Sequence, residues 1–227
     1  MEKHIFRPLL PNVRQCVIFG LALSLLLGSV AAAERWSVQA RWVPDGDTIY
    51  LDSGQKIRLK GVDAPEMGSD SHPEQLFARE SRAYLWRLVK GARLTVLTKG
   101  LEADRFGRIV ALVELPDGRS VNEVMVEQGF AFVFPHSKQK DRSEQRLLSC
   151  QRRAMNQQRG FWSRILSEPF AGDSYLGNLR SKRFHDVQCR YGQMISPDNL
   201  VRFSSLREAF YSGFAPGRRC TPWPEKH

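Results

Sequence analysis

Five short segments rich in β-forming residues constrain the fold of this 227-residue chain more than any other feature. In several of them apolar and polar residues alternate, which suits a strand that is buried on one face only. The five segments are residues 38–43, 48–51, 56–60, 93–98 and 108–115. Turn-forming residues separate the second segment from the third, at Asp52-Ser53-Gly54. We therefore predict five β-strands.

The spacing of apolar residues changes to that of a helix in three places. Within residues 74–90 these residues recur on one helical face. Ser120 and Glu123 form a capping box, which predicts a short helix that ends at Gly129. Residues 142–159 carry a thin apolar stripe and predict a third helix. One helix between the third and fourth strands and two after the fifth indicate an α+β fold, a five-stranded Greek-key barrel such as the OB-fold.

Segments of different composition flank the predicted barrel, which spans residues 34–166. Residues 1–33 have a basic start, an apolar run and the small residues Ala31-Ala32-Ala33, as in a cleaved signal peptide. The apolar run is too short for a membrane-spanning helix. We therefore expect an exported protein, periplasmic or secreted, with no stable membrane partner. The alternative is a protein anchored in the membrane by an uncleaved N-terminal segment. Residues 167–227 are rich in Gly, Ser, Asn and Arg, which predicts a small basic C-terminal module.

The balance of charge is strongly basic. The chain has 34 Lys and Arg against 24 Asp and Glu, a formal net charge of +10. Cleavage after residue 33 would remove three basic residues and one acid and leave +8. A basic protein of this kind suits an anionic partner such as nucleic acid, although an excess of charge can also serve solubility alone.

Two acidic turns stand next to the predicted second and third strands. Asp45 and Asp47 flank Gly46 just before one strand, and Asp63 and Glu66 follow the other. Each turn by itself is common punctuation between strands. If the two strands pair, however, four acids gather at one edge of the barrel. Like charges so close repel one another unless a cation or a catalytic purpose holds them there.

Two arginines lie near these acids in the predicted barrel. Arg58 is on the strand that leads to Asp63, and Arg108 begins the hairpin after the first predicted helix. Carboxylates that hold a hard divalent ion, a carboxylate that activates water and two guanidiniums for phosphate oxygens form a complete set for phosphodiester cleavage. His72 and His136 each stand alone, so the barrel offers no spacing typical of a soft metal site.

Five motifs in one order extend this pattern over residues 36–163, and together they resemble the staphylococcal nuclease (thermonuclease) family. The motifs are Asp45-Gly46-Asp47-Thr48, Arg58-Leu59-Lys60-Gly61-Val62-Asp63-Ala64-Pro65-Glu66, Asp104-Arg105-Phe106-Gly107-Arg108, Val121-Asn122 and Gly160-Phe161-Trp162. The resemblance implies an OB-fold with three helices and a hydrolase, an endonuclease that cleaves DNA, RNA or both and leaves 3′-phosphate ends. It also implies one bound Ca²⁺.

The same resemblance assigns roles to single residues. Asp47 and Asp63 would bind Ca²⁺ through their carboxylates and Ala64 through its backbone carbonyl. The catalytic residues would be Glu66, which activates water, and Arg58 and Arg108, which bind the scissile phosphate. Asp45 and Thr48 would support the metal site.

The chain also departs from the family at several positions. Phe106 replaces a tyrosine that packs against the nucleotide, and Pro135 and Ser137 stand near two further tyrosine positions. These changes leave the base preference open. Gln151 stands where the family usually has Glu in the last helix, so we expect a different hydrogen bond or ion pair there.

The tail weakly resembles an Ada-type zinc-binding module. His185, Cys189 and Cys220 are candidate Zn²⁺ ligands, one short of a closed structural site, because Gly217 replaces a further cysteine. The competing prediction is a Cys189–Cys220 disulfide, which an oxidising compartment favours. Cys150 is expected to be a small buried residue of the third helix.

Two other functions are compatible with the same fold. A non-catalytic OB-fold module would bind single-stranded nucleic acid, and an envelope adaptor would use the barrel only as a scaffold. Neither function needs three acids beside two arginines, so the nuclease is the prediction that accounts for most residues.

Overall fold

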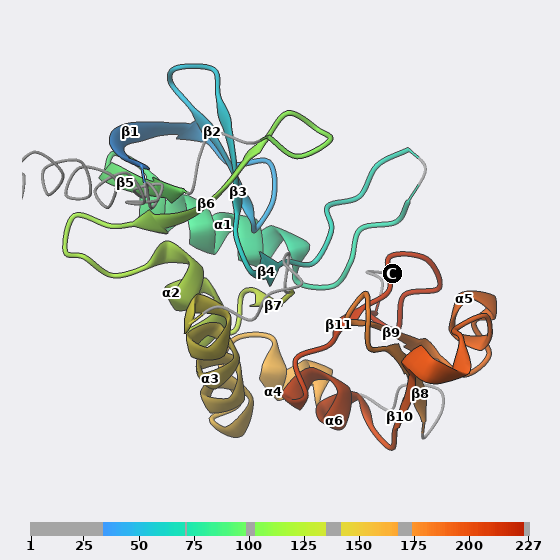
Figure 1. Ribbon diagram of the computed structural model, residues 1–227. Helices are drawn as coiled ribbons and strands as arrows, with labels where there is room; N and C mark the ends of the chain where they lie inside the picture. Colours follow the sequence, from blue (N-terminus) through green and yellow to red (C-terminus); the bar gives the residue numbers. More distant parts are fainter. Residues whose placement is uncertain (1–33, 71, 99–102, 135–141, 168–173, 225–227) are drawn as a thin grey trace, which may run out of the picture. The chain divides into compact units, whose positions relative to one another are not determined.

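The computed structural model describes residues 34–70, 72–98, 103–134, 142–167 and 174–224 (Figure 1). The predicted signal peptide, residues 1–33, lies outside the described residues, as do His136, Pro135 and Ser137. Within the described ranges no helix is both long and apolar enough to cross a membrane.

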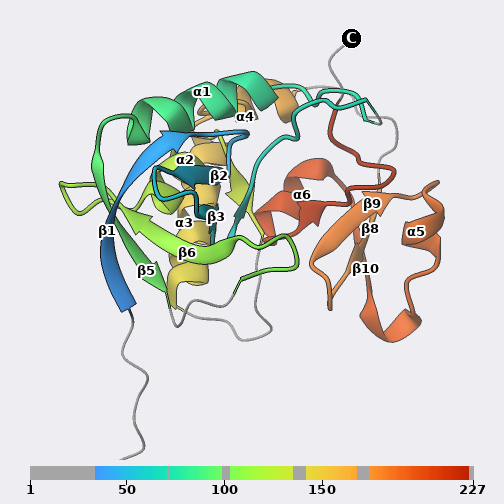
Figure 2. The same cartoon turned by 90° about the horizontal axis from the view of Figure 1, so that it is seen from above.

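Five strands close into a barrel, as the sequence predicts. They are β1 (Glu34–Trp42), β2 (Thr48–Leu51), β3 (Lys56–Leu59), β5 (Arg93–Thr98) and β6 (Ile109–Glu114), and they neighbour one another in the order β1-β2-β3-β6-β5. Only the β3–β6 pair is parallel; the other pairs are antiparallel. The long β1 pairs with both β2 and β5, and its register shifts between Ala40 and Trp42. Figure 2 shows this strand curving around the barrel.

Alternation of side chains gives the barrel its core. Along β6, Ile109, Ala111 and Val113 are buried and the residues between them are partly exposed. The buried residues of the other strands join them in one apolar cluster. This inward face explains why the strand pattern of the sequence could be recognised.

Four helices accompany the barrel: α1 (Ala78–Val89), α2 (Val121–Glu127), α3 (Arg142–Asn156) and the short α4 (Trp162–Ile165). The capping residue predicted for α2 is in place, because the Ser120 hydroxyl accepts a hydrogen bond from the Glu123 N–H. The predicted start of α1 at residue 74 is wrong. Phe77 has a φ of 69°, so the helix cannot extend back through it.

The C-terminal module, residues 174–224, forms its own four-stranded sheet. The strands lie in the order β10 (Leu200–Phe203), β8 (Tyr175–Asn178), β9 (Arg183–Asp186) and β11 (Ala215–Pro216). Helices α5 (Arg190–Gln193) and α6 (Leu206–Tyr211) and the 3₁₀ turn η1 (Pro197–Asn199) connect them. A separate two-stranded ribbon joins β4 (Val62–Asp63) to β7 (Phe132–Val133).

Aromatic side chains join the C-terminal module to the barrel's helices in one core. Phe132, Phe161 and Trp162 pack with Phe210 and Trp223 of the module, mostly edge to face, at centroid distances from 4.8 to 6.4 Å. The Trp223 indole N–H also donates to the Leu76 carbonyl at 2.9 Å. Such ring pairs contribute beyond their buried area.

Gln151 of α3 adds a polar link inside this core. Its amide oxygen accepts from the Val133 N–H at 2.7 Å, and its amide nitrogen donates to the Phe210 carbonyl at 2.5 Å. A glutamate could accept the first bond but could not donate the second. The glutamine at this position therefore suits a barrel that carries a module.

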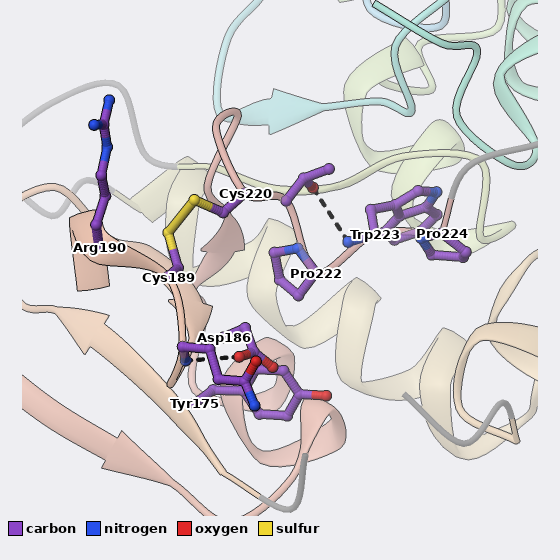
Figure 3. A pocket seen from close by; sticks show the side chains of 10 residues that line it. Tyr175, Asp186, Cys189, Arg190, Cys220, Pro222, Trp223 and Pro224 are labelled. Atoms are coloured by element: carbon purple, nitrogen blue, oxygen red, sulfur yellow. Dashed lines mark hydrogen bonds between the residues drawn. A yellow bond between two sulfur atoms is a disulfide. The ribbon is translucent and has the colours of Figure 1, made fainter. Parts of the chain in front are cut away.

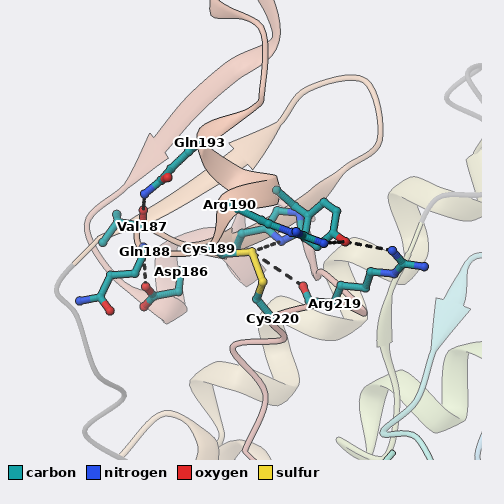
Figure 4. Close-up of a disulfide and its surroundings, with 10 residues drawn as sticks. Asp186, Val187, Gln188, Cys189, Arg190, Gln193, Arg219 and Cys220 are labelled. Atoms are coloured by element: carbon teal, nitrogen blue, oxygen red, sulfur yellow. Dashed lines mark hydrogen bonds between the residues drawn. A yellow bond between two sulfur atoms is a disulfide. The ribbon is translucent and has the colours of Figure 1, made fainter. Parts of the chain in front are cut away.

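A disulfide joins Cys189 and Cys220 of the module, which are 31 positions apart in the sequence (Figure 4). The structure therefore has the bridge rather than the zinc site. His185 Nδ1 lies 3.6 Å from the Cys189 sulfur, but both cysteines are paired with each other. A Cβ at Gly217 would lie 2.2 Å from His185 Cε1, so the imidazole fills the space that a fourth ligand would need. Cys150 is buried and free, as predicted.

Reduction of this bridge should lower the free energy of unfolding by about 3 kcal/mol, since a cross-link of this length restricts the unfolded chain. Urea unfolding with and without dithiothreitol measures the difference. Cys150→Ser, which keeps both bridging cysteines, should respond to the reductant as wild type does. Identical unfolding curves of the wild-type protein with and without reductant would show that the bridge contributes nothing.

Candidate active site

Strands β2, β3 and β4 bring three of the predicted residues together in the interior. Thr48, next to Asp47, pairs with Arg58 across β2 and β3, and Asp63 lies in β4. Asp47, Arg58 and Asp63 are 6%, 1% and 2% exposed. Asp47 and Asp63 therefore come together, as the pairing of the two strands predicts.

Arg58 is the centre of this cluster. Its Nη2 lies 2.8 Å from Asp63 Oδ1 and 3.0 Å from Asp47 Oδ2. Its Nη1 donates to the carbonyls of Leu59 and Val62 at 3.1 and 2.7 Å. A buried guanidinium with this many acceptors is fixed in place, and it holds the two carboxylates close to each other.

Both carboxylate oxygens of Asp47 accept hydrogen bonds. Oδ2 also accepts from the Ala64 N–H at 3.0 Å, and Oδ1 accepts from the Thr48 hydroxyl at 3.1 Å. Asp45 supports the turn by accepting from the Asp47 N–H at 3.0 Å. Burial raises the pKa of Asp47 well above its usual range, and the nearby Arg58 only partly opposes this effect.

Gly46 lets this turn lie close to its neighbours. A Cβ at this position would be 2.7 Å from the Ala64 Cβ and 2.8 Å from the Ser81 Cβ. Real Cβ contacts essentially never come so close, so a side chain here would push the first acidic turn away from the second. Steric crowding therefore explains why a glycine stands between Asp45 and Asp47.

Glu66 and Arg108 are more accessible than the buried cluster. The side chain of Glu66 is 47% exposed, and its pKa is raised, chiefly by loss of hydration. Arg108 is bound to Asp104, with Nη2 2.7 Å from Oδ2, and its Nη1 lies 3.5 Å from the Thr48 hydroxyl. Thr48 therefore connects Arg108 to the cluster, since it also binds Asp47.

Phe106 stands exposed between two arginines. The guanidinium carbons of Arg105 and Arg108 lie 4.7 and 5.1 Å from its ring centroid. The side chain is 56% exposed. The ring keeps an open face beside Arg108, although it lacks the hydroxyl that the family's tyrosine has.

Two further arginines reach this site from the C-terminal module, and the sequence did not predict them. Arg183 Nη1 lies 2.8 Å from Asp63 Oδ2, and Arg218 Nη2 lies 3.4 Å from Asp63 Oδ1. Arg218 also lies 3.3 Å from Glu66 Oε1. Burial alone would raise the pKa of Asp63, but the guanidiniums of Arg183, Arg58 and Arg218 outweigh it and lower the pKa to about 2.

The donor set fits a hard divalent cation. Arg58 Nη2 lies within 3.0 Å of both Asp47 Oδ2 and Asp63 Oδ1, so two carboxylates, the kind of ligand that Ca²⁺ prefers, stand side by side. Among the residues whose positions are described, no three His, Cys, Asp or Glu side chains converge as a closed metal site does. Two protein carboxylates leave most of the six to eight positions around Ca²⁺ to a backbone carbonyl, water and substrate oxygens.

A hollow of about 600 Å³ lies elsewhere, in the C-terminal module (Figure 3). It is lined by Tyr175, Asp186, Cys189, Cys220, Pro222 and Trp223, among others. Neither the acidic cluster nor the arginines that contact it line this hollow, so it is a separate feature.

Several known proteins are similar to this chain in sequence. The family model described as staphylococcal nuclease homologue matches residues 56–164. An uncharacterised endonuclease of Escherichia coli is 37% identical over 124 residues, which is 53% of this chain and 73% of that protein. The thermonuclease of Staphylococcus hyicus is 32% identical over 128 residues, which is 53% of this chain and 72% of that protein. Endonuclease YhcR of Bacillus subtilis is 29% identical over 197 residues, which is 76% of this chain but 16% of that protein.

Proposed function

Because the chain belongs to the staphylococcal nuclease homologue family and is a nuclease, we propose that it is an exported, calcium-dependent endonuclease that cleaves DNA, RNA or both. The observation that carries the proposal is the buried Arg58, whose Nη2 lies within 3.0 Å of both Asp47 and Asp63. This arrangement keeps two carboxylates side by side, as the proposed metal site requires. A module that only binds nucleic acid has no need of it.

Each residue of the site has a task that suits its position. Asp47, Asp63 and the carbonyl of Ala64 would hold Ca²⁺, which when bound polarises the phosphate and offsets its charge. Glu66 accepts a proton from the attacking water, and its raised pKa suits a general base. Arg58 and Arg108 bind phosphate oxygens and stabilise the added charge of the transition state.

The proposed reaction is the hydrolysis of a phosphodiester bond. The water oxygen forms a bond to phosphorus while its proton passes to Glu66. The bond between phosphorus and the 5′-oxygen breaks, that oxygen takes up a proton from solvent, and Glu66 releases its proton to solvent. The products are a 3′-phosphate and a 5′-hydroxyl.

Cleavage of plasmid DNA and of RNA, with Ca²⁺ or with the chelator EGTA, tests the proposal. We expect cleavage of at least one substrate with Ca²⁺ and none with EGTA. Glu66→Gln should cut the rate by about 10²- to 10⁴-fold, as for the loss of a general base. Glu80→Gln, which neutralises an exposed acid of α1 outside the site, is the control and should match wild type.

Two results would contradict this mechanism. Equal rates for wild type and Glu66→Gln would show that Glu66 is not the general base. Undiminished cleavage in EGTA would show that the reaction does not need calcium. Export is tested separately by N-terminal sequencing of the protein from the periplasm or medium, which should begin near residue 34.

A further inference from the structure

The C-terminal module places two arginines on the acids of the nuclease site, and they are held very differently. Arg183 of β9 is anchored: Nη1 donates to the Pro216 carbonyl at 2.8 Å, and the guanidinium lies 3.6 Å from the centroid of the Phe134 ring. Its side chain is only 15% exposed. It therefore belongs to the permanent framework around Asp63.

Arg218 is held more loosely. It follows β11, the edge strand that pairs with β9, and its side chain is 49% exposed. Its contacts with Asp63 and Glu66 are 3.4 and 3.3 Å long, against 2.8 Å for Arg183 with Asp63. A half-exposed ion pair of this length contributes little to stability and can be exchanged for another partner.

Arg218 occupies carboxylates that the proposed metal site also needs. It binds Asp63, one of the two carboxylates expected to hold Ca²⁺, and Glu66, the expected base. A guanidinium and a divalent cation on the same carboxylate repel each other. Metal binding therefore favours the departure of Arg218 from the carboxylates.

A phosphodiester is the natural new partner for the released guanidinium. Arginine binds phosphate oxygens with paired, charge-assisted hydrogen bonds. The substrate's phosphate must reach the atoms next to Asp63 and Glu66, where Arg218 already lies.

We propose that Arg218 is a substrate-phosphate ligand contributed by the C-terminal module, and that Asp63 and Glu66 hold it while metal and nucleic acid are absent. The proposal rests on the proposed nuclease function. It makes the binding of metal and substrate cooperative, because each of them favours the position of Arg218 that the other needs. Such coupling is reciprocal by thermodynamic necessity.

Calorimetric titration with Ca²⁺ alone and steady-state cleavage of a labelled oligonucleotide test this role in the full-length mature protein. For Arg218→Gln we expect Ca²⁺ to bind about tenfold more tightly, because one of the three guanidiniums on Asp63 is gone. At saturating Ca²⁺ the KM should rise about tenfold, because a charged contact to phosphate is lost. Arg218→Lys keeps the charge without the paired hydrogen bonds, and both of its values should fall between those of wild type and Arg218→Gln.

Arg219→Gln is the matched control. It removes the same charge from the next residue, whose guanidinium lies 2.9 Å from the Tyr191 hydroxyl rather than on the acids. Both of its constants should stay within about twofold of wild type at physiological salt, where exposed charges are screened. A thermal melt of each variant confirms that the module is folded.

The outcomes separate the two proposals. If Arg218→Gln and Arg219→Gln bind Ca²⁺ alike, or if their KM values agree, Arg218 has no such role even though the enzyme is a nuclease. If the wild-type protein neither binds Ca²⁺ nor cleaves, the proposed function itself is wrong.

Discussion

Replacing Arg58 with methionine should abolish nuclease activity and also lower the free energy of unfolding by about 3–5 kcal/mol. Arg58 is 1% exposed and is the shared cation of Asp47 and Asp63. Without it, two buried carboxylates face each other, and the carbonyls of Leu59 and Val62 lose a donor. Plasmid cleavage and urea unfolding followed by tryptophan fluorescence measure the two losses.

Arg108→Met separates catalysis from stability. Arg108 is 20% exposed by side chain, and its ion pair with Asp104 is near the surface. We expect its loss to lower activity strongly but to change the free energy of unfolding by only about 1 kcal/mol or less. If Arg58→Met were as stable as Arg108→Met, the buried cluster would not hold this edge of the barrel together.

Gly160→Ala should cost about 4 kcal/mol or more, enough to unfold much of the protein. Gly160 has a φ of +55°, and a Cβ there would lie 2.2 Å from the Gly129 carbonyl oxygen and 2.4 Å from that of Gln128. These oxygens belong to the backbone and cannot move aside. Gly129 is equally confined, since a Cβ on it would lie 2.2 Å from the Arg159 oxygen.

Gly118→Ala is the control for backbone conformation. Its φ is +82°, but nothing lies within 4 Å of the added Cβ. It should cost only the left-handed conformation, about 1–2 kcal/mol. Urea midpoints of the two variants compare these costs. Equal midpoints would mean that the close approach of the two loops, at residues 129 and 160, is not needed for folding.

The barrel could be predicted because the residue pattern that specifies each strand lies within that strand. Alternating residues such as Ile109, Ala111 and Val113 mark a buried face within a single strand. The two capping residues of α2, Ser120 and Glu123, likewise lie within four consecutive positions of the sequence. The start of α1 was placed too early because the left-handed backbone at Phe77 leaves no mark on the apolar spacing.

The site could be predicted only in part, for a similar reason. Asp47, Arg58 and Asp63 come together because neighbouring strands pair, which the sequence indicates. Arg183 and Arg218 reach Asp63 through a sheet whose strands have two to four residues, too short to show a period. One residue did indicate a contact with the module. Gln151 replaces the family's glutamate, and its amide donates a hydrogen bond to the Phe210 carbonyl of the module.

The aromatic core shared by barrel and module limits how far this chain can be shortened. Phe132, Phe161 and Trp162 are at most 2% exposed, and rings of the module cover them. A gene shortened before Tyr175 would encode a barrel with these rings facing water, and such a surface favours aggregation. Loss of the module would therefore require new, polar side chains on α4 and β7.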